Sequence, residues 1–495
     1  MMKTVEIYTK YSEKLKQIIR KNKDKNIEKT LAAISAYADL AYNWNQFYSD
    51  FEIEDLICKL SDKIYSKDCC YCKFNKLAND EYKADDSTVL FYDCFGLDTR
   101  GLATIYAKAL VSLNYKVIWV TTDKAIGKIP TIEKFLGKGN VVKVFIDMSS
   151  SYQKHIEQLS EAFEMYAPKR AFFYTKPNDV CAEIVFYNYK NKVTRYQINL
   201  TDHAFWLGNN AFDYCLEFRE YGAGLSRIER KIDESKIVLL PYYPLIDTSV
   251  EYQGLPFDKT GKKVLFSGGS LYKTIGGDNK FYKIVAKVLE DNADTVFLYA
   301  GSGDDSELVK LSEKFVGRVY HIQERKDLFA LMAHVDAYIN TYPMIGGLMS
   351  QYAAMAGLPP IILIDKGNTD SSGIILHQDK ANIEFYNVEE VVNELNHLLQ
   401  DFDYRKQRAE DIKKRVFSET EFTSLLSDIM QGKAKSCKVD CPDTMWFRKE
   451  YISRFKFNMI LSAIASRKNT SLMFNFIDLF ALQFAKKVVK NLVKR

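Results

Sequence analysis

The hydrophobic pattern divides the chain into a helical beginning and a long stretch of alternating strands and helices. Residues 1–84 are largely polar and contain no strand-like run, but apolar residues recur at helical spacing over 31–60. From residue 87 onward, short β-rich runs alternate with helix-like segments, beginning with strand, loop, helix and strand over residues 88–121. Such units are typical of a parallel sheet that is covered on both faces. Further strand-like runs of this first series lie at 141–146, 170–174, 195–200, 213–218 and 236–240.

A stretch containing prolines and glycines interrupts this alternation before a second series of strands begins. Pro241, Pro244 and Pro256 disfavour regular structure there. The second series has strand-like runs at 263–267, 295–300, 318–322, 336–340 and 360–364. The pattern therefore predicts an α/β protein with two Rossmann-like domains. Its expected parts are a helical extension at 1–84, a first domain at 85–245, a linker at 246–262, a second domain at 263–435 and a C-terminal tail at 436–495.

Composition and charge narrow the class of protein. With 47% hydrophobic residues among 495, the chain has ample apolar surface for two cores, which excludes a disordered or fibrous protein. The formal net charge of +5 is unevenly spread, because the chain from Trp446 onward holds eleven basic and two acidic residues, a charge of +9. The remaining body then carries 5 − 9 = −4. Basic charge confined to a tail does not indicate a nucleic-acid-binding body, so we expect no nucleic-acid partner.

Signals for export, membrane insertion and metal binding are weak. No apolar core of signal-peptide length precedes the charged residues 20–25, and the longest apolar stretch, 472–485, is interrupted by polar residues. We therefore expect a cytoplasmic protein without a membrane-spanning helix. The odd count of nine cysteines favours reduced thiols. One group of cysteines lacks the paired CxxC spacing of a zinc site. Free thiols and metal ligands are the two alternatives for this group, which contains Cys58, Cys69, Cys70 and Cys72.

Glycine-bearing loops follow three strands of the second series. Gly268 and Gly269 come directly after the strand at 263–267, Gly301 follows the next strand, and Gly346 and Gly347 precede a helix-like segment. At the carboxyl edge of a parallel sheet, backbone N–H groups of such loops can approach a diphosphate. Each loop by itself is equally consistent with a tight turn. The sequence lacks the GxGxxG dinucleotide fingerprint and the P-loop, which argues against a dehydrogenase and a P-loop NTPase.

Several segments of the second half carry a family resemblance, namely 264–269, 297–303, 327–332, 336–343 and 346–361, which includes Gly357-Leu358-Pro359. In these segments the chain resembles the donor-nucleotide domain of GT-B glycosyltransferases, enzymes with two Rossmann domains that use nucleotide sugars. The resemblance covers about residues 85–430. It implies an acceptor domain followed by a donor domain, a nucleoside-diphosphate sugar as donor substrate, and no cofactor. The donor-binding residues expected on this basis are Gly268, Gly269, Ser270, Lys273, Gly301, Arg325, Lys326, Gly346, Gly347 and Ser350.

The same resemblance bears on the type of reaction. Many retaining members of the family carry two glutamates beside the glycine loop, but the corresponding places here hold Met344 and Tyr352. The Gly346-Gly347 form looks more like the branch that includes O-GlcNAc-type transferases, which invert. The pattern Asp401-Phe402-Asp403 lies in a charged, helix-like stretch and is not a convincing metal motif. These features imply inverting, metal-independent transfer, in which N–H groups and cations stabilise the diphosphate.

His203 is the candidate catalytic base of the first domain. It follows the strand at 195–200, so it is expected at the carboxyl edge of the sheet, facing the second domain. A sugar transfer needs an acceptor hydroxyl that loses its proton, and histidine suits this role at neutral pH. Asp202 is a candidate to orient the imidazole, although neighbours on an extended segment point in opposite directions. The alternative for His203 is a structural hydrogen bond beside the packed pair Phe205-Trp206.

Other first-domain candidates come from two further loops. Glu217 and Arg219 follow a strand, and a carboxylate there suits catalysis or acceptor binding, with a surface ion pair as the alternative. Thr99 and Arg100 open a helix, where the arginine is a candidate for contact with phosphate or an acidic acceptor. We therefore expect His203, Asp202 and Glu217 in catalysis, and Thr99, Arg100 and Arg219 in acceptor binding.

The tail from 446 to 495 interleaves aromatic and basic residues. An apolar stripe at helical spacing contains Met473, Phe476, Ile477, Phe480, Phe484 and Val488. Such a helix suits an anionic membrane surface, and the same stripe suits packing against the protein's own domains or a dimer contact. The sequence thus predicts a peripheral-membrane transferase at the inner face of the plasma membrane, acting on a glycan or lipid-linked glycan in polysaccharide synthesis. A nucleotide-sugar epimerase of the same architecture and a non-catalytic scaffold are the alternatives.

Overall fold

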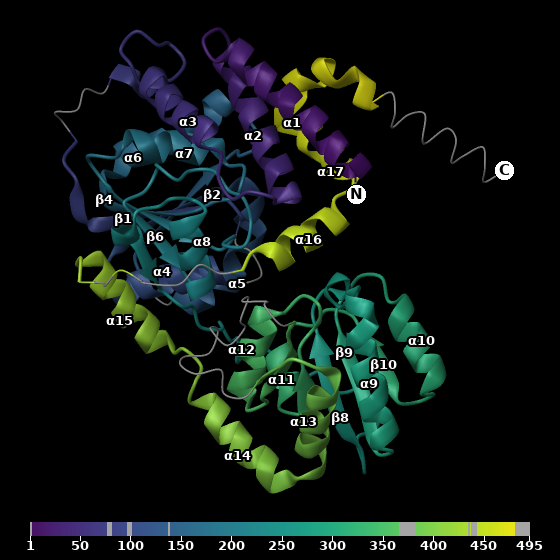
Figure 1. The fold of residues 1–495 in the computed structure, drawn as a ribbon. Coiled ribbons are helices and arrows are strands. Elements are labelled where there is room, and N and C mark those ends of the chain that lie inside the picture. The colour runs from purple at the N-terminus through teal and green to yellow at the C-terminus, as the bar shows by residue number, and fades with distance from the viewer. Residues whose placement is uncertain are drawn as a thin grey trace. The chain divides into compact units, whose positions relative to one another are not determined.

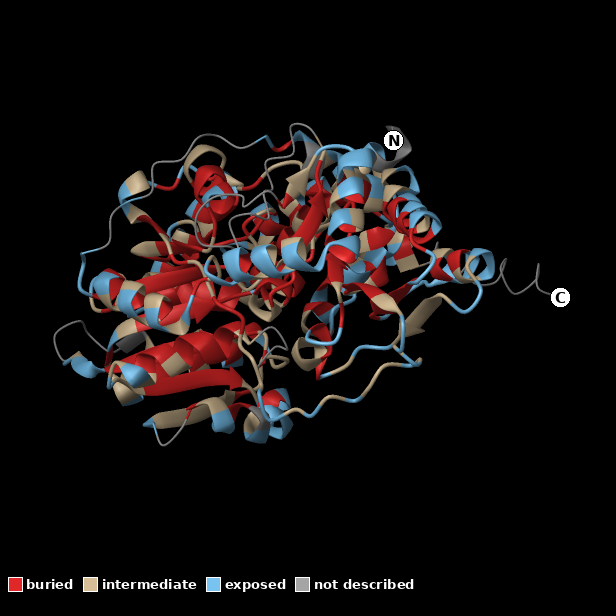
Figure 2. Ribbon diagram, turned by 90° about the horizontal axis from the view of Figure 1, so that it is seen from below, coloured by how far each residue is buried: buried red, intermediate tan, exposed pale blue. Residues whose placement is uncertain are grey.

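The computed structural model describes residues 2–76, 82–96, 101–136, 139–365, 383–433, 436 and 443–480 (Figure 1). The chain forms two compact units. Unit 1 comprises Met1–Leu240 together with Thr423–Arg495, and unit 2 comprises Pro241–Phe422. The central strands are mostly buried, whereas β3 (Val141–Ile146), β10 (Val319–Ile322) and β13 (Glu384–Phe385) toward the edges of the sheets are partly exposed (Figure 2), as expected of parallel sheets covered by helices.

Unit 1 is built on a seven-stranded parallel sheet in the order β3-β2-β1-β4-β5-β6-β7. Its central strand β1 is buried from Thr88 to Asp93, with alternate residues facing opposite layers. Tyr92 lies against Phe186, and Phe91 lies against Tyr106 on the other face. The strands are β1 (Asp85–Asp93), β2 (Lys116–Thr122), β3 (Val141–Ile146), β4 (Pro168–Tyr174), β5 (Thr194–Asn199), β6 (Tyr214–Glu217) and β7 (Ile237–Leu239).

The helices of unit 1 include the predicted N-terminal ones. Several begin at a side chain that caps the first turn, as Asn26 does for α2 and Asp50 for α3. α2 is buried on most sides because α1, α7 and α17 pack around it. The helices are α1 (Met2–Asn22), α2 (Ile27–Trp44), α3 (Phe51–Ile64), α4 (Leu102–Ser112), α5 (Ile129–Leu136), α6 (Tyr152–Tyr166), α7 (Val180–Asn188), α8 (Glu220–Ile228), α16 (Met445–Arg454) and α17 (Phe457–Ile464).

Unit 2 repeats the strand order on a smaller scale, as a six-stranded parallel sheet ordered β10-β9-β8-β11-β12-β13. The strands are β8 (Lys263–Gly268), β9 (Thr295–Ala300), β10 (Val319–Ile322), β11 (Ala337–Ile339), β12 (Pro360–Leu363) and β13 (Glu384–Phe385). The helices are α9 (Lys280–Asp291), α10 (Ser306–Lys314), α11 (Leu328–Met332), α12 (Gly347–Ala356), α13 (Val388–Gln400) and α14 (Phe402–Lys413), and α15 (Glu419–Met430) leads back into unit 1. The prediction of two Rossmann-like sheets is confirmed.

The strand order places a ligand-binding edge in each unit. In each sheet the order reverses beside the first strand, between β1 and β4 in unit 1 and between β8 and β11 in unit 2. The loops on either side of such a switch point diverge and leave a crevice at the carboxyl ends of the strands. The loops that carry the predicted site residues leave from these carboxyl ends.

The C-terminal segment 443–480 packs on unit 1 itself. Phe455 lies 5.1 Å from Trp44, centroid to centroid, and Phe476 packs against Tyr11. Of the apolar stripe, Phe476 is buried, whereas Met473 and Ile477 are exposed. Phe484 and Val488 lie outside the described residues. The described part of the tail thus follows the packing alternative, and none of the described helices combines the length and apolar character needed to cross a bilayer.

Candidate active site

His203 and Asp202 form a hydrogen-bonded pair just beyond the carboxyl end of β5. The distance from His203 Nδ1 to Asp202 Oδ1 is 3.1 Å. The Asp202 side chain is completely buried, while 28% of the His203 side chain is exposed. The expectation that these neighbours point in opposite directions is wrong, because residues 202 and 203 lie in a turn rather than on an extended segment. The pair therefore presents an oriented imidazole to solvent.

Arg219 keeps the carboxyl group of Asp202 ionised. It is the residue before α8, and its Nη2 donates to Asp202 Oδ1 over 2.9 Å while its Nε donates to Oδ2. Burial by itself raises the pKa of Asp202, but Arg219 and His203 outweigh it and the net pKa is lowered. An ionised carboxylate only accepts hydrogen bonds, so Nδ1 of His203 carries a proton, and in the neutral imidazole the lone pair is then on Nε2. That is the arrangement required of a general base.

A second arginine, Arg230, holds the backbone of the same turn. Its Nη2 donates to the carbonyl oxygens of Asp202 and Ala204 over 2.8 and 2.7 Å. The guanidinium is 1% exposed and lies 4.9 Å from the ring centre of Trp206. Burial lowers the pKa of Arg230. The sequence offers no signal for this role, because the residue lies 28 positions from Asp202 on another element.

The N-terminal helices also support the turn. Asn45 ends α2 in the left-handed conformation, and its amide donates to the His203 carbonyl over 2.9 Å and accepts from the Phe205 N–H over 3.2 Å. Farther along the loop, the buried carboxyl of Glu54 on α3 accepts the N–H groups of Gly208 and Asn209. The helical extension is therefore part of the scaffold that positions His203.

Glu217 lies beneath the site rather than in it. It ends β6, is fully buried, and accepts from Asn199 over 2.9 Å and from the Ser226 hydroxyl. Burial raises its pKa. A side chain at Gly222 would place its Cβ 2.3 Å from Glu217 Oε2, so glycine is needed there. With no exposed surface, Glu217 does not reach an acceptor in this conformation, contrary to the expectation of a direct catalytic role.

Of the three predicted acceptor-binding residues, the structure describes Arg219 alone. Arg219 is 8% exposed and its guanidinium is engaged by Asp202, so its surroundings favour a positioning role over contact with an acceptor. Thr99 and Arg100 lie outside the described residues.

In unit 2, the loops after β8 and β9 meet closely at the carboxyl edge. Gly269 has φ +127, a conformation that favours glycine. Its carbonyl accepts from the Tyr299 hydroxyl over 3.0 Å, and a Cβ at Gly301 would lie 1.9 Å from the same oxygen. Both glycines are therefore required by this approach of two loops. Ser270 and Lys273 follow on the same loop, where Lys273 is half-buried.

The loop from Asn340 to Gly347 is held by one side chain. Asn340 Oδ1 accepts the N–H groups of Thr341 and Gly346 over 2.7 and 2.9 Å, and its amide donates to the Ser350 hydroxyl. Ser350 is 1% exposed and so supports the loop from below. α12 then begins at Gly347 without a side-chain cap, which leaves its first N–H groups available to an anion.

The cations predicted for the donor site separate into two environments. Arg325 is engaged by Asp327 and by the Gly254 carbonyl, so it ties the linker to unit 2 and is not free to meet a phosphate. Lys326 beside it is exposed.

A cluster that was not anticipated from the sequence lies at the start of α9. Lys280 Nζ is 3.4 Å from Asp365 Oδ1 and 3.3 Å from the Tyr342 hydroxyl, which itself donates to Asp365 over 2.8 Å. Lys280 begins α9, Tyr342 lies in the loop after β11 and Asp365 follows β12, so the three residues carry no common motif.

A buried network behind the sheet joins the C-terminal segment to β1. Lys468 Nζ donates to His155 Nδ1 over 2.8 Å, and His155 Nε2 lies 3.1 Å from the Tyr92 hydroxyl, which donates to Asp179 over 2.7 Å. Burial, aided by Lys468, lowers the pKa of His155 to about 3. His155, Asp179 and Cys181 are close enough to form a metal cluster, but Lys468 is bonded into it.

Comparisons with known proteins identify the fold. No family model and no curated protein matches the sequence. Among solved structures, a point mutant of O-GlcNAc transferase from Thermobaculum terrenum matches with a TM-score of 0.51 at 14% identity, covering 88% of this chain and 79% of that one. A putative UDP-N-acetylglucosamine 2-epimerase from Listeria monocytogenes matches with a TM-score of 0.51 at 11% identity, covering 72% and 100%. Anabaena HepE, in complex with UDP and glucose, matches with a TM-score of 0.51 at 12% identity, covering 70% and 99%. The chain has the GT-B fold, as the sequence resemblance predicts.

Proposed function

We propose that this protein is a glycosyltransferase that moves a sugar from a nucleoside-diphosphate sugar to a hydroxyl group of a glycan or lipid-linked glycan. The observation that carries the proposal is the Asp202–His203 pair, an oriented and partly exposed base at the carboxyl edge of the unit 1 sheet. Arg219 is paired with Asp202 and Arg230 holds the carbonyl oxygens of the same turn, and the cost of burying two arginines supports a requirement for this geometry.

The reaction follows from the roles of the groups. His203 Nε2 takes the proton of the acceptor hydroxyl as its oxygen attacks the anomeric carbon of the donor. The bond from that carbon to the diphosphate breaks, and the diphosphate leaves with the electron pair. One base and one leaving group suffice for direct displacement, which inverts the anomeric centre. Asp202 stabilises the imidazolium that forms on His203.

The donor is proposed to bind at the switch point of unit 2, between β8 and β11. The uncapped N-terminus of α12 offers its first N–H groups to the diphosphate, whereas the N–H groups of Gly269, Gly301 and Gly346 donate within the fold. Lys273 is adjacent, because its carbonyl accepts the Met344 N–H over 3.2 Å and so joins the two loops. These groups supply the charge stabilisation without a metal ion.

An epimerase is the second candidate, because the Listeria structure matches as well by TM-score as the transferase structure does. The extent of the match favours the transferase, since the O-GlcNAc transferase structure covers 88% of this chain against 72% for the epimerase. Proton NMR of the protein with UDP-, GDP-, CDP- and dTDP-sugars separates the candidates: transfer or hydrolysis releases nucleoside diphosphate, whereas epimerisation changes the sugar signals alone. A scaffold does neither.

The test of the catalytic assignment is His203→Ala, with His397→Ala as a matched control. His397 is about half exposed on α13 of unit 2, where it pairs with Asp401 and stacks on Tyr404. We expect transfer or donor hydrolysis to fall by about a hundredfold or more in His203→Ala, with circular dichroism unchanged, and to stay near wild type in the control. Full activity in His203→Ala refutes the assignment of the base.

We also propose that the protein attaches to an anionic membrane surface through residues 481–495. These residues contain Lys486, Lys487, Lys490, Lys494 and Arg495 and no acidic residue. Basic clusters of this size are attracted to anionic lipid headgroups. Flotation with phosphatidylglycerol vesicles tests this: a variant ending at residue 480 should stay in the unbound fraction, and equal flotation of both proteins refutes it.

A further inference from the structure

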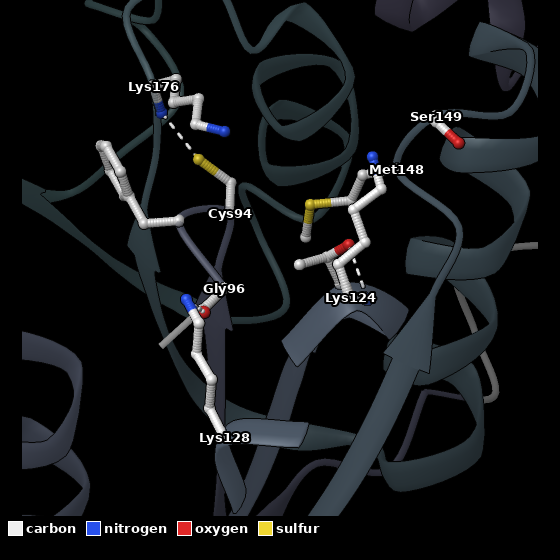
Figure 3. A pocket seen from close by; sticks show the side chains of 9 residues that line it. Cys94, Gly96, Lys124, Lys128, Met148, Ser149 and Lys176 are labelled. Atoms are coloured by element: carbon white, nitrogen blue, oxygen red, sulfur yellow. Dashed lines mark hydrogen bonds between the residues drawn. The ribbon is translucent and has the colours of Figure 1, made fainter. Parts of the chain in front are cut away.

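A cavity of about 280 Å³ opens at the carboxyl edge of the unit 1 sheet (Figure 3). Its lining comes from the ends of four adjacent strands, β3, β2, β1 and β4. This places it at the point where the strand order reverses, which is where ligands bind in open α/β sheets. The lining residues are Cys94, Phe95, Gly96, Thr122, Lys124, Lys128, Met148, Ser149 and Lys176.

The charge of this pocket is one-sided. Its nine lining residues include three lysines and no carboxylate, and Lys124, Lys128 and Lys176 are all exposed. Lys128 Nζ donates to the Gly96 carbonyl over 2.9 Å, which draws the ammonium inward, and Lys176 Nζ lies 5.6 Å from the centre of the Phe95 ring. Three cations around a small concave surface produce a positive potential that selects an anionic ligand.

The acidic residues next to the pocket are engaged by their own loops. Asp93 accepts the Phe95 N–H over 2.9 Å, Asp123 accepts the Lys124 N–H over 2.9 Å, and Asp147 accepts from the N–H and hydroxyl of Ser149. These bonds fix three of the loops that line the pocket, including the one that carries Lys124 and Lys128, so the carboxylates act as turn caps.

The walls of the pocket are anchored from behind. The Lys176 N–H donates to Cys94 Sγ over 2.9 Å, so two lining segments are tied together. On the opposite side, Lys468 of the C-terminal segment donates to the Met148 carbonyl over 3.4 Å. The pocket is thus a built feature of the fold, with backbone and buried side chains holding its shape.

We propose that this pocket binds a phosphate group carried by the acceptor, with the lysines as its cationic partners. Lysine suits phosphate as a strongly charged point donor. The volume exceeds what one phosphate needs, and Phe95 and Met148 add an apolar wall for the group attached to it, either a sugar ring or the start of a lipid chain. That the phosphate belongs to the acceptor rests on the proposed function, whereas the binding of a phosphate group in this pocket does not.

The test is isothermal titration calorimetry on the full chain in low salt, with galactose 1-phosphate, farnesyl phosphate and galactose as probes. We expect both phosphates, or one of them, to bind and galactose not to bind. Preference for galactose 1-phosphate indicates a soluble glycan phosphate, and preference for farnesyl phosphate indicates a lipid-linked one. Absence of binding by both phosphates overturns the proposal.

Variants locate the binding. Lys124→Ala and Lys176→Ala should each weaken the phosphate probe about tenfold, the effect of one lost charge-assisted hydrogen bond. Lys169→Ala is the matched control, because Lys169 is exposed near the amino end of β4 while Lys176 follows its carboxyl end. Unchanged binding in both pocket variants overturns the proposal.

The outcome is separable from that of the proposed function. If the phosphate binds in the pocket but no nucleotide sugar is ever consumed, the pocket stands and the transferase assignment fails. If sugar transfer proceeds and the pocket variants use the acceptor as well as wild type does, the transferase assignment stands and the pocket proposal fails.

Discussion

The buried carboxyl of Glu54 is the most sensitive point of the scaffold that supports His203. It lies on α3 and accepts the N–H groups of Gly208 and Asn209 over 3.1 and 3.0 Å. Burial raises its pKa to about 8, more than these two hydrogen bonds lower it. The negative charge of Asp50 raises it further, and the buried carboxyl of Glu183, whose own pKa is raised by burial, faces the same loop. In Glu54→Gln, an amide oxygen can accept the same N–H groups without ionising.

The sign of the effect follows from proton linkage. The folded protein keeps a proton that the unfolded chain releases between the ordinary pKa of 4.5 and about 8, so the free energy of unfolding falls as pH rises through this window. At 1.36 kcal/mol for each factor of ten in proton affinity, the whole window corresponds to about 5 kcal/mol. Between pH 6 and pH 9, about 3 kcal/mol of this remains to be lost. Measured against wild type, Glu54→Gln should therefore gain about 3 kcal/mol of stability between pH 6 and pH 9.

Tryptophan fluorescence in urea measures this difference in unit 1 alone. All four tryptophans, Trp44, Trp119, Trp206 and Trp446, belong to that unit. Glu52→Gln is the control on the same helix, because the Glu52 side chain is 54% exposed and its pKa is lowered by Arg20. That group is ionised throughout pH 6–9 in both states, so its removal should change the stability equally at the two ends.

The reasoning is refuted if Glu54→Gln and wild type differ by the same free energy at pH 6 and at pH 9. That result would mean that Glu54 is ionised in the folded protein, and that water or rearrangement compensates its burial. A fall in stability of Glu54→Gln at both pH values would show instead that the amide does not reproduce the two hydrogen bonds.

Three further predictions concern the same scaffold. Asp202→Asn should lower the rate of transfer about a hundredfold with little change in the KM for the donor, because the amide no longer fixes the imidazole tautomer; steady-state kinetics with a threefold loss or less would contradict this. Gly208→Ala should lower the unfolding free energy of unit 1 by about 3 kcal/mol, because the new Cβ would lie 1.9 Å from a buried carboxyl oxygen. The control Gly432→Ala, in open surroundings, should cost about 1 kcal/mol, and equal urea midpoints of the two variants would contradict the prediction. Lys468→Met should raise the pKa of His155, measured by NMR titration, because a neighbouring positive charge is removed; an unchanged pKa would mean that Lys468 is not bonded there in solution.

The fold is predictable because its determinants are local. Runs such as 88–94 and 263–267 are apolar enough to be buried on both faces, and the helices between them are amphipathic, so the alternation alone specifies parallel sheets. The very short strand β13 carries no such run, because only two residues pair with β12. Its place depends on a neighbour rather than on its own sequence.

The site is only partly predictable because its geometry depends on distant contacts. His203 is identifiable from its position after a strand, but its hydrogen bond to Asp202 requires a turn that an extended-chain expectation misses. Arg219 reads as an exposed cation in the sequence, yet its partner is 17 residues away and buried. Asn45 lies 158 residues from the carbonyl it holds, a separation that no local pattern reveals.

The C-terminal tail has two parts that differ in role, although both are basic. The tail charge of +9 divides into +4 in residues 446–480 and +5 in residues 481–495. In the first part the charges serve the fold: Arg448 pairs with Glu229, Arg454 with Glu450, and Lys468 joins the buried network. Because these contacts and the aromatic packing of Phe455 are already made within unit 1, these side chains are not available to a membrane while the segment stays folded. The proposed membrane attachment therefore rests on the five basic residues of 481–495, whose removal leaves these contacts of unit 1 in place.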